Sequence, residues 1–406
     1  MEVDVRPFDG DPRAFYEAGE LAFGERPRDE DFAPWQTLFE ADRAIGAYDG
    51  DRLVGTAGIF SFDFTVPGGV LPTAGVTIVG VHPTHRRRGI LREMMRAQLD
   101  AIHDRGEPLA ILWASEGSIY QRFGYGLGSL RMGAKIARDR SAFRRPHSPA
   151  GTMRFVEVDE ATRLFAPIYD AVRETRPGFF ARSPAYWDTE FFRDPEHWRR
   201  GASAAWHVVH ETAGVADGYA RYRIREEWDD SGPKSSVVLV ELMATNPAAH
   251  LDVWRYLLDI DLTATLDAWN LAPDDPILFT VAEPRRLGMT LGDALWVRVV
   301  DVPSALAGRR YRSDGRLVIE VEDEFCEWND ARWSLAVEDG VPFVEAATSA
   351  ADLACDITDL GAAYLGGFTF AQLADAGRVR ELEPGAIARA DALFRTDRVP
   401  WCPKVF

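Results

Sequence analysis

One segment near the N-terminus constrains the fold more than any other part of the chain. A β-branched run, GVTIVGV at 75–81, stops at Pro83 and is followed by three consecutive arginines, Arg86–Arg88. A helical pattern at 90–104 comes next, and then an apolar run at 109–115. Apolar side chains recur at helical spacing in that pattern, at Leu91, Met94, Met95, Leu99 and Ile102. The order strand, basic turn, helix, strand predicts a βαβ unit and an α/β fold.

The turn before this helix has the chemistry of a phosphate-binding site. Gly89 lets the backbone approach a ligand closely, and a helix that begins at Ile90 presents free amides and a positive dipole end. Arg86, Arg87 and Arg88 add positive charge that suits a pyrophosphate. A basic loop that is only solvated is the alternative, and the strand–turn–helix placement favours the phosphate site.

A second region mixes strand and helix patterns over 152–295. The stretch 241–259 repeats the strand–turn–helix order, but Asn246–His250 stand where the arginine turn would be. We therefore expect a degenerate second copy of the first unit that has lost cofactor binding. The run ILFTVAE at 277–283 is interpreted as a strand.

The residues from 296 onward have a different order of predicted elements. Strand patterns, beginning with 296–306, are followed by helical patterns at 347–366 and 369–377, an order typical of an α+β domain. The arginine-rich, proline-bounded stretch 138–151 marks the first boundary. The predicted domains are 1–150, 151–295 and 296–406.

Composition excludes several functional classes. The chain has 46 Lys+Arg against 64 Asp+Glu, a net charge of −18, which argues against nucleic acid. An acidic surface favours cationic partners, and a charge that serves only solubility is the alternative. No apolar run reaches the roughly 20 residues of a membrane span, and no signal-peptide pattern opens the chain. The three cysteines form no CxxC and the eight histidines no HExxH, so neither a disulfide framework nor a metal site is expected. A cytoplasmic location is expected.

Four stretches carry a resemblance to a known family. Arg86-Arg87-Arg88-Gly89-Ile90-Leu91 resembles the acyl-CoA signature of GNAT acetyltransferases, Arg/Gln-x-x-Gly-x-Gly/Ala, with Leu91 departing from the usual small residue. The longer string PTHRRRGILR at 83–92 resembles the Eis (enhanced intracellular survival) type of N-acetyltransferase. The stretches 114–126 and 359–379 and the terminus WCPKVF agree with that type, so the resemblance extends over nearly the whole chain.

The resemblance implies an architecture and an activity. The expected fold is α/β and α+β, with tandem GNAT-like regions, the second degenerate, followed by a sterol-carrier-protein-like C-terminal domain. The family also implies a hexamer. The expected reaction is acetyl transfer from acetyl-CoA to a primary amine of a cationic acceptor (aminoglycoside, polyamine or lysine), directly within a ternary complex. The alternative is a non-enzymatic lipid or small-molecule binding protein with a vestigial acetyltransferase half.

The resemblance also implies the residues that hold the cofactor. A strand pairs its backbone with the pantetheine arm, a turn and helix start cradle the pyrophosphate, and the end of the next strand makes a second contact. These positions are Val79, Gly80 and Val81 for the strand; Arg87, Arg88, Gly89, Ile90, Leu91 and Arg92 for the turn; and Ser115 and Glu116 for the second contact.

The position of the general acid in the family pattern Tyr-x-x-x-Gly-aromatic is Tyr120, with Tyr125 as the second candidate. A phenol with a pKa near 10 can protonate a thiolate that forms beside it, since a thiol has a pKa of about 8.5 in water. Packing in the aromatic core is the alternative role for either residue.

The expected general base is the terminal carboxylate, which Phe406 carries. A protonated amine must lose a proton before it attacks a thioester, so some acceptor is required. A frayed, irrelevant chain end is the alternative. The tail contains Trp401, Pro403 and Val405, which favours a docked end.

The acceptor channel is less well specified. A stretch of acidic and aromatic residues is expected where the channel begins, and an ordinary surface helix is the alternative. This stretch consists of Phe23, Asp29, Glu30, Asp31, Phe32 and Trp35. Val405 stands where some relatives carry an acid. Val405 removes a negative charge near the acceptor amine, which argues against the aminoglycoside preference of those relatives.

Overall fold

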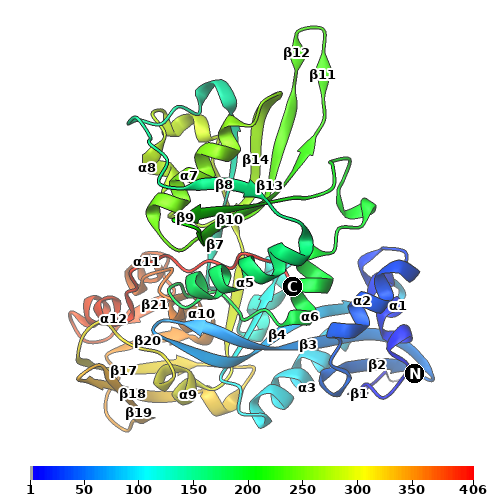
Figure 1. The fold of residues 1–406 in the computed structure, drawn as a ribbon. Helices are drawn as coiled ribbons and strands as arrows, with labels where there is room; N and C mark the ends of the chain where they lie inside the picture. Colours follow the sequence, from blue (N-terminus) through cyan, green and yellow to red (C-terminus); the bar gives the residue numbers. More distant parts are fainter. Residues whose placement is uncertain (1–2) are drawn as a thin grey trace. The chain divides into compact units, whose positions relative to one another are not determined.

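The computed structural model describes residues 3–406, which form two compact units (Figure 1). The first unit contains residues 3–129, 294–400 and 404–406, and the second contains residues 130–293 and 401–403. Each unit is therefore assembled from segments that are far apart in the sequence. No helix among the described residues is both long and apolar enough to cross a lipid bilayer.

A seven-stranded sheet forms the N-terminal part of the first unit. In the order of the sheet its strands are β1 (Asp4–Pro7), β2 (Ile45–Asp49), β3 (Arg52–Val66), β4 (Gly69–Val81), β5 (Leu109–Trp113), β16 (Leu295–Val299) and β6 (Gly126–Leu127). Helix α3 (Ile90–Asp104) connects β4 to the parallel strand β5 and packs on β2, β3 and β4. The predicted βαβ unit is confirmed, and its first strand begins six residues earlier than the expected 75–81.

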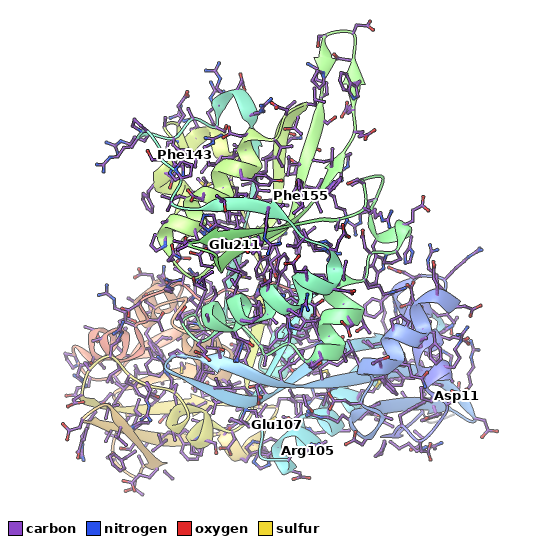
Figure 2. All side chains as sticks on the ribbon, in the orientation of Figure 1. Asp11, Arg105, Glu107, Phe143, Phe155 and Glu211 are labelled. Atoms are coloured by element: carbon purple, nitrogen blue, oxygen red, sulfur yellow. The ribbon has the colours of Figure 1, made fainter. Side chains whose placement is uncertain are left out.

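The other helices of this part precede or follow the βαβ unit. They are α1 (Pro12–Phe23), α2 (Asp29–Leu38) and α4 (Gly117–Tyr120). Asp11 caps α1 by accepting a hydrogen bond from the N–H of Arg13 at 3.0 Å (Figure 2). The buried Glu107, which precedes β5 and is labelled in Figure 2, pairs with the buried Arg43, and this ties the turn after α2 to the sheet.

The second unit repeats this plan. Its main sheet has the order β15 (Thr290–Asp293), β7 (Leu130–Ala137), β14 (Thr263–Leu271), β13 (Ser235–Ala244), β10 (Val215–Arg225), β9 (Trp206–Thr212) and β8 (Thr152–Phe155), with a small hairpin of β11 (Trp228–Asp229) and β12 (Gly232–Pro233). Helix α7 (Pro247–Asp259) joins β13 to the parallel β14, as α3 joins β4 to β5. The remaining helices are α5 (Val158–Arg173), α6 (Pro184–Tyr186) and α8 (Ile277–Thr280).

The start of α7 differs from the start of α3. The Asn246 side chain accepts from the N–H of Ala249 at 2.9 Å and donates to Asp217, also at 2.9 Å. The helix N-terminus is thus capped by the protein itself, and no arginine turn precedes it. The strand expected at 277–283 is wrong: the Asp275 carboxylate accepts from the N–H of Ile277 and starts the short helix α8 there.

A second sheet completes the first unit. Its order is β19 (Val341–Ala346), β18 (Ala331–Glu338), β17 (Gly315–Glu322), β20 (Leu353–Asp356) and β21 (Val379–Glu381), and its helices are α9 (Val302–Ala307), α10 (Ile357–Tyr364), α11 (Phe370–Asp375) and α12 (Ala386–Phe394). Two expectations are wrong in part. The strand expected at 296–306 ends at Val299 and gives way to α9, and the helix expected at 347–366 is preceded by strand β20.

Two strands do not follow the linear division of the sequence. Strand β7 lies within the predicted first domain, 1–150, but pairs with β14 in the second unit. Strand β16 opens the predicted third domain, 296–406, but pairs with β5 and β6 in the first sheet. The domain boundaries stay a prediction, and these pairings show how strands are shared between neighbouring regions.

A buried ion pair joins the two sheets of the first unit. The Arg298 guanidinium on β16 donates to both carboxylate oxygens of Asp323, at 2.9 and 2.6 Å, with both side chains almost wholly buried. Asp323 also accepts from the N–H groups of Phe325 and Cys326 and from the Asn329 amide. The turn after β17 is therefore fixed to the first sheet through one carboxylate.

Replacing Arg298 with methionine should destabilise the first unit by about 3–5 kcal/mol, because it leaves the Asp323 charge buried without its partner. Urea unfolding followed by tryptophan fluorescence measures this loss. The double variant R298M/D323N removes both charges while its amide oxygen can still accept from the Phe325 and Cys326 N–H groups, and it should recover part of the loss. A loss below about 1 kcal/mol in R298M would show that the pair does not hold the sheets together.

Candidate active site

A gap between two neighbouring strands of the first sheet is the starting point of the site. In the described chain, β4 pairs with β5 only over Thr73, Ala74 and Gly75, opposite Leu109, Ala110 and Ile111. Both strands continue beyond these pairs, to Val81 and Trp113. Past Gly75 the edge of β4 that faces β5 is therefore open to another extended partner.

A bulge in β4 sets the direction of the backbone along this gap. The register with β3 shifts at Ile78, which has a φ of +52°. The N–H of His82 donates to the carbonyl of Val54 at 2.8 Å. Because ladder bonds alternate along an antiparallel strand, the N–H groups of Val79 and Val81 point away from β3, toward the side of β5. Gly80 lies between them, opposite Thr56.

The turn after β4 is held by its own side chains. His85 is buried and its Nε2 lies 3.0 Å from the Asp49 carboxylate. The Arg86 guanidinium donates to the carbonyls of Val81, at 3.1 Å, and Ala22, at 2.7 Å. Arg86 therefore anchors the turn to α1, which leaves the following residues to face a ligand.

The next residues form an exposed cradle. Arg87 has a φ of +63° and Gly89 a φ of +86°, and a Cβ at Gly89 would meet open space. Arg87, Arg88 and Gly89 are all exposed, and no side chain within residues 3–406 caps the α3 N-terminus. The side chain of Ile90 is buried and that of Leu91 is half-buried, so these two residues offer their backbone amides. The geometry suits a pyrophosphate.

The other edge of the gap carries the second predicted contact. Ser115 and Glu116 follow the end of β5 directly and are both exposed. Glu116 occupies the N-cap position of α4, and that short helix ends at Tyr120. The two edges of the gap thus carry the predicted cofactor residues.

Tyr120 lies in the apolar cluster beside the gap. It packs with Ala74 and Val76 of β4, and the half-buried Val79 and Leu91 pack against the same cluster. Burial raises the pKa of Tyr120 to about 12, so the phenol stays protonated at any physiological pH. The ring of Tyr125 lies edge-on at 5.8 Å.

Tyr125 is a poorer candidate for the acid. It is completely buried, which raises the pKa of its phenol further than that of Tyr120. Among the described residues its hydroxyl has no hydrogen-bond partner. A group with no exposed surface cannot exchange its proton with a substrate as directly as Tyr120 can.

The last residue of the chain packs against β3. The ring of Phe406 lies 5.0 Å from the ring of Phe62, edge-on. A Cβ on Gly75 would lie 2.2 Å from the Phe62 ring, so that ring covers Gly75 closely. Gly75 is the last residue that pairs with β5. The chain end is thus placed beside the point where the strands part.

The acid and the chain end lie on opposite faces of β4. Side chains alternate along a strand, so Ala74 and Val76, which pack with Tyr120, face away from Phe62 and Gly75. The Tyr120 phenol therefore lies on one face of the strand and the Phe406 ring on the other. Phe62 was not singled out in the sequence, because one phenylalanine in a long alternating strand carries no distinguishing signal.

The residues just before the chain end are anchored in the second unit. The Trp401 indole N–H donates to the Asn270 amide oxygen at 2.8 Å, and the Asn270 amide donates to the Cys402 carbonyl at 3.0 Å. The backbone of Trp401 lies against Gly178, where a Cβ would be 2.7 Å from the Trp401 carbonyl oxygen. The tail is docked, as the apolar sequence predicted.

The predicted acceptor residues form two groups. Phe32 and Trp35 of α2 pack on Tyr16 at 5.6 and 5.3 Å, and Asp29 pairs with Arg13. The other three predicted acceptor residues form the second group. Phe23 is exposed at the end of α1, and Glu30 and Asp31 lie in the first turn of α2.

Negative charge also gathers between α1 and α2. Burial and the charges of Glu25 and Asp31 raise the pKa of Glu20. The Asp29 carboxylate is paired with Arg13, whereas Glu20 and Asp31 lie close enough for their charges to interact. Sequence reasoning missed Glu20 because it sits inside the regular pattern of α1.

Three domain families match the chain. Residues 7–128 and 178–299 each match an acetyltransferase (GNAT) domain, and residues 302–403 match a sterol carrier protein domain. The expected order of tandem GNAT-like regions and a sterol-carrier-protein-like region is confirmed.

Similar full-length proteins and solved structures agree with these domain matches. An uncharacterized N-acetyltransferase of Streptomyces avermitilis is 45% identical over 100% of both chains. N-acetyltransferase Eis of Mycobacterium tuberculosis is 33% identical, over 91% of this chain and 90% of that one. The crystal structure of Eis1 from Mycobacterium abscessus superposes with a TM-score of 0.85 at 33% identity, covering 99% of this chain and 100% of that one.

Proposed function

Because the chain belongs to the Eis-type family of GNAT N-acetyltransferases, we propose that it transfers acetyl from acetyl-CoA to a primary amine of a small cationic acceptor, directly within a ternary complex. GNAT domains use acyl-CoA donors in general, and acetyl is the donor group proposed here. The observation that carries the proposal is the gap between β4 and β5, with the uncapped α3 N-terminus at one end and Tyr120 beside it.

The donor is held mainly by backbone groups. The outward N–H groups of Val79 and Val81 extend the sheet with the amides of the pantetheine arm. Arg87, Arg88 and the amides of Gly89, Ile90 and Leu91 neutralise the pyrophosphate, while Ser115 and Glu116 lie at the opposite edge of the gap.

The chemical step needs one proton acceptor and one donor. An alkylamine with a pKa near 10 is protonated at neutral pH, so the Phe406 carboxylate, directly or through one water, removes a proton. The free amine forms a bond to the thioester carbonyl carbon, and the bond from that carbon to sulfur breaks. The Tyr120 phenol gives its proton to the departing thiolate, and the second proton that leaves the acylated nitrogen passes through water to the Tyr120 phenolate as the amide forms. Products are an amide and free CoA.

The acceptor class follows from charge. The chain carries −18 overall, and the acids around Glu20 lie next to the aromatic rings of α2. Acids beside half-buried aromatic rings attract organic cations with several amines. Polyamines, aminoglycosides and lysine side chains share this chemistry. The hexamer that the family resemblance implies stays a prediction.

Release of CoA tests the proposed function. The protein, without a C-terminal tag, is mixed with acetyl-CoA and each of a set of polyamines, aminoglycosides and lysine peptides, and free thiol is measured with a colour reagent. Turnover with multi-amine cations but not with neutral amino acids is expected. A failure to bind acetyl-CoA in titration calorimetry would overturn the enzymatic assignment of the gap.

A further inference from the structure

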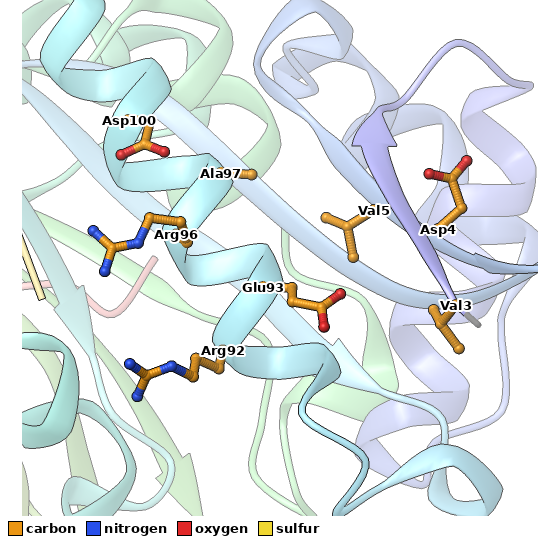
Figure 3. Close-up of a pocket in the computed structure, with 8 residues that line it drawn as sticks. All are labelled: Val3, Asp4, Val5, Arg92, Glu93, Arg96, Ala97 and Asp100. Atoms are coloured by element: carbon orange, nitrogen blue, oxygen red, sulfur yellow. The ribbon is translucent and has the colours of Figure 1, made fainter.

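Two arginines on α3 share one aromatic ring. The guanidinium carbons of Arg92 and Arg96 lie 5.5 and 4.1 Å from the centre of the Phe325 ring, which is buried. Figure 3 shows both side chains projecting from the same side of α3, while Glu93 projects from another side. An open hollow of about 900 Å³ borders this stretch of the helix.

Neither guanidinium is neutralised by the described part of the chain. Among residues 3–406, no carboxylate lies within 4.0 Å of Arg92 or Arg96 in an ion pair, whereas Arg105 on the same helix pairs with Asp42 at 3.3 Å. Asp4, Glu93 and Asp100 also border the hollow, but Asp4 is paired with Arg6 and Asp100 lies one turn farther from the helix start than Arg96. Two positive charges held together in so acidic a chain indicate a site for an anion.

The position on the helix identifies which anion. Arg92 and Arg96 follow the pyrophosphate cradle at Gly89 by about 4.5 and 10 Å along the axis, at 1.5 Å per residue. Helical side chains lean toward the N-terminus, which brings both guanidinium groups back toward the cradle. Coenzyme A carries a phosphate monoester on its ribose close to the pyrophosphate, with a charge of about −1.5 to −2 at neutral pH.

We propose that Arg96, together with Arg92, binds the ribose 3′-phosphate of the acyl-CoA donor and thereby selects CoA over donors without that phosphate. The inference rests on the proposed function of the gap. It adds Arg96 and Phe325 to the residues that the sequence predicted.

The C-terminal region supplies the aromatic ring of Phe325, over which both arginines lie. Phe325 belongs to the turn after β17, where Asp323 accepts from the N–H groups of Phe325, at 3.2 Å, and Cys326, at 3.0 Å. Arg298 fixes Asp323 in turn. Phe325 also packs edge-on against Phe123, just after Tyr120, at 5.2 Å. The sterol-carrier-like region thus acts in cofactor recognition through Phe325, in addition to carrying the chain end.

Binding of CoA and dephospho-CoA, measured by calorimetry on the full-length untagged protein, tests the inference. Wild type should bind CoA about 10- to 100-fold more tightly than dephospho-CoA, because charge-assisted hydrogen bonds to one phosphate contribute about that factor in affinity. Arg96→Gln should lose most of that preference by weakening CoA binding alone. Arg96→Lys should keep part of the preference. Phe325→Leu, which keeps an apolar side chain but removes the aromatic ring, should lower it to an intermediate value.

The control is Arg105→Gln, which removes a charge from the same helix and should leave both affinities unchanged. An unaltered CoA to dephospho-CoA ratio in Arg96→Gln would overturn the subsite while leaving the proposed function intact. An equal weakening of both ligands would assign Arg96 a merely structural role and also overturn it. If wild type bound neither ligand, the proposed function itself would fail.

Discussion

A peptide fused after Phe406 lowers kcat by at least about 100-fold, while acetyl-CoA still binds with unchanged affinity. The fusion turns the terminal carboxylate into a neutral amide, which cannot accept a proton at neutral pH. General base catalysis contributes about 10²- to 10⁴-fold, so the loss should fall in that range. The ring of Phe406 packs on Phe62, so the chain end also has no room to slide aside without losing that contact.

Two matched variants separate the carboxylate from the ring. Phe406→Ala keeps a terminal carboxylate but removes the ring contact, and it should lose less activity than the fusion. The same peptide fused before residue 1 should have no effect on turnover. Steady-state kinetics with a saturating amine and calorimetry with CoA give both readouts. Full turnover by the C-terminal fusion would exclude the carboxylate as the base.

Local rules predict α3 and its surroundings well. Gly89, the apolar spacing of Met95, Leu99 and Ile102, and the stop at Gly106 are all encoded within a few turns of chain. The helix consequently begins and ends where the sequence places it. Strand β3 likewise covers residues 52–66, whose sequence RLVGTAGIFSFDFTV is typical of a strand with a glycine-containing bend.

Elements that depend on distant partners are predicted poorly. The sequence LACD at 353–356 lies among helix formers, yet it is a strand because it pairs in parallel with β17. The β-branched and aromatic residues of 277–283 favour a strand, yet Asp275 caps a helical turn there. Strand β16 joins the first sheet because it pairs with β5, residues 109–113, which lie much earlier in the sequence.

The candidate site also contains a part that local sequence predicts and a part that depends on distant partners. The cradle at 87–92 is one continuous segment, so its chemistry can be recognised from residue types and spacing. The contacts of Phe406 with Phe62, and of Arg96 with Phe325, join residues from distant parts of the chain. No local pattern predicts them. The family resemblance implied a role for the chain end, but not the ring that receives it.

Replacing Tyr120 with phenylalanine should lower kcat by about 10²- to 10⁴-fold, the usual contribution of a general acid. The phenol is the group beside the gap that can protonate the thiolate, and phenylalanine fills the same apolar cluster without a proton to give. Acetyl-CoA affinity should therefore change little. Because the pKa of Tyr120 is raised to about 12, the phenol stays protonated between pH 6 and 9, and wild-type activity should not decline there through its ionisation.

Tyr125→Phe is the matched control, because it removes a hydroxyl from the same turn and the same cluster. That hydroxyl is buried and has no partner among the described residues, so its loss should leave folding stability and turnover nearly unchanged. Steady-state kinetics and CoA titration of both variants, over pH 6 to 9, separate the two tyrosines. Equal turnover by Tyr120→Phe and wild type would remove Tyr120 as the acid, and a selective loss in Tyr125→Phe would transfer the role to Tyr125. A selective loss in Tyr120→Phe, with CoA binding retained, is the result that the geometry of the gap predicts.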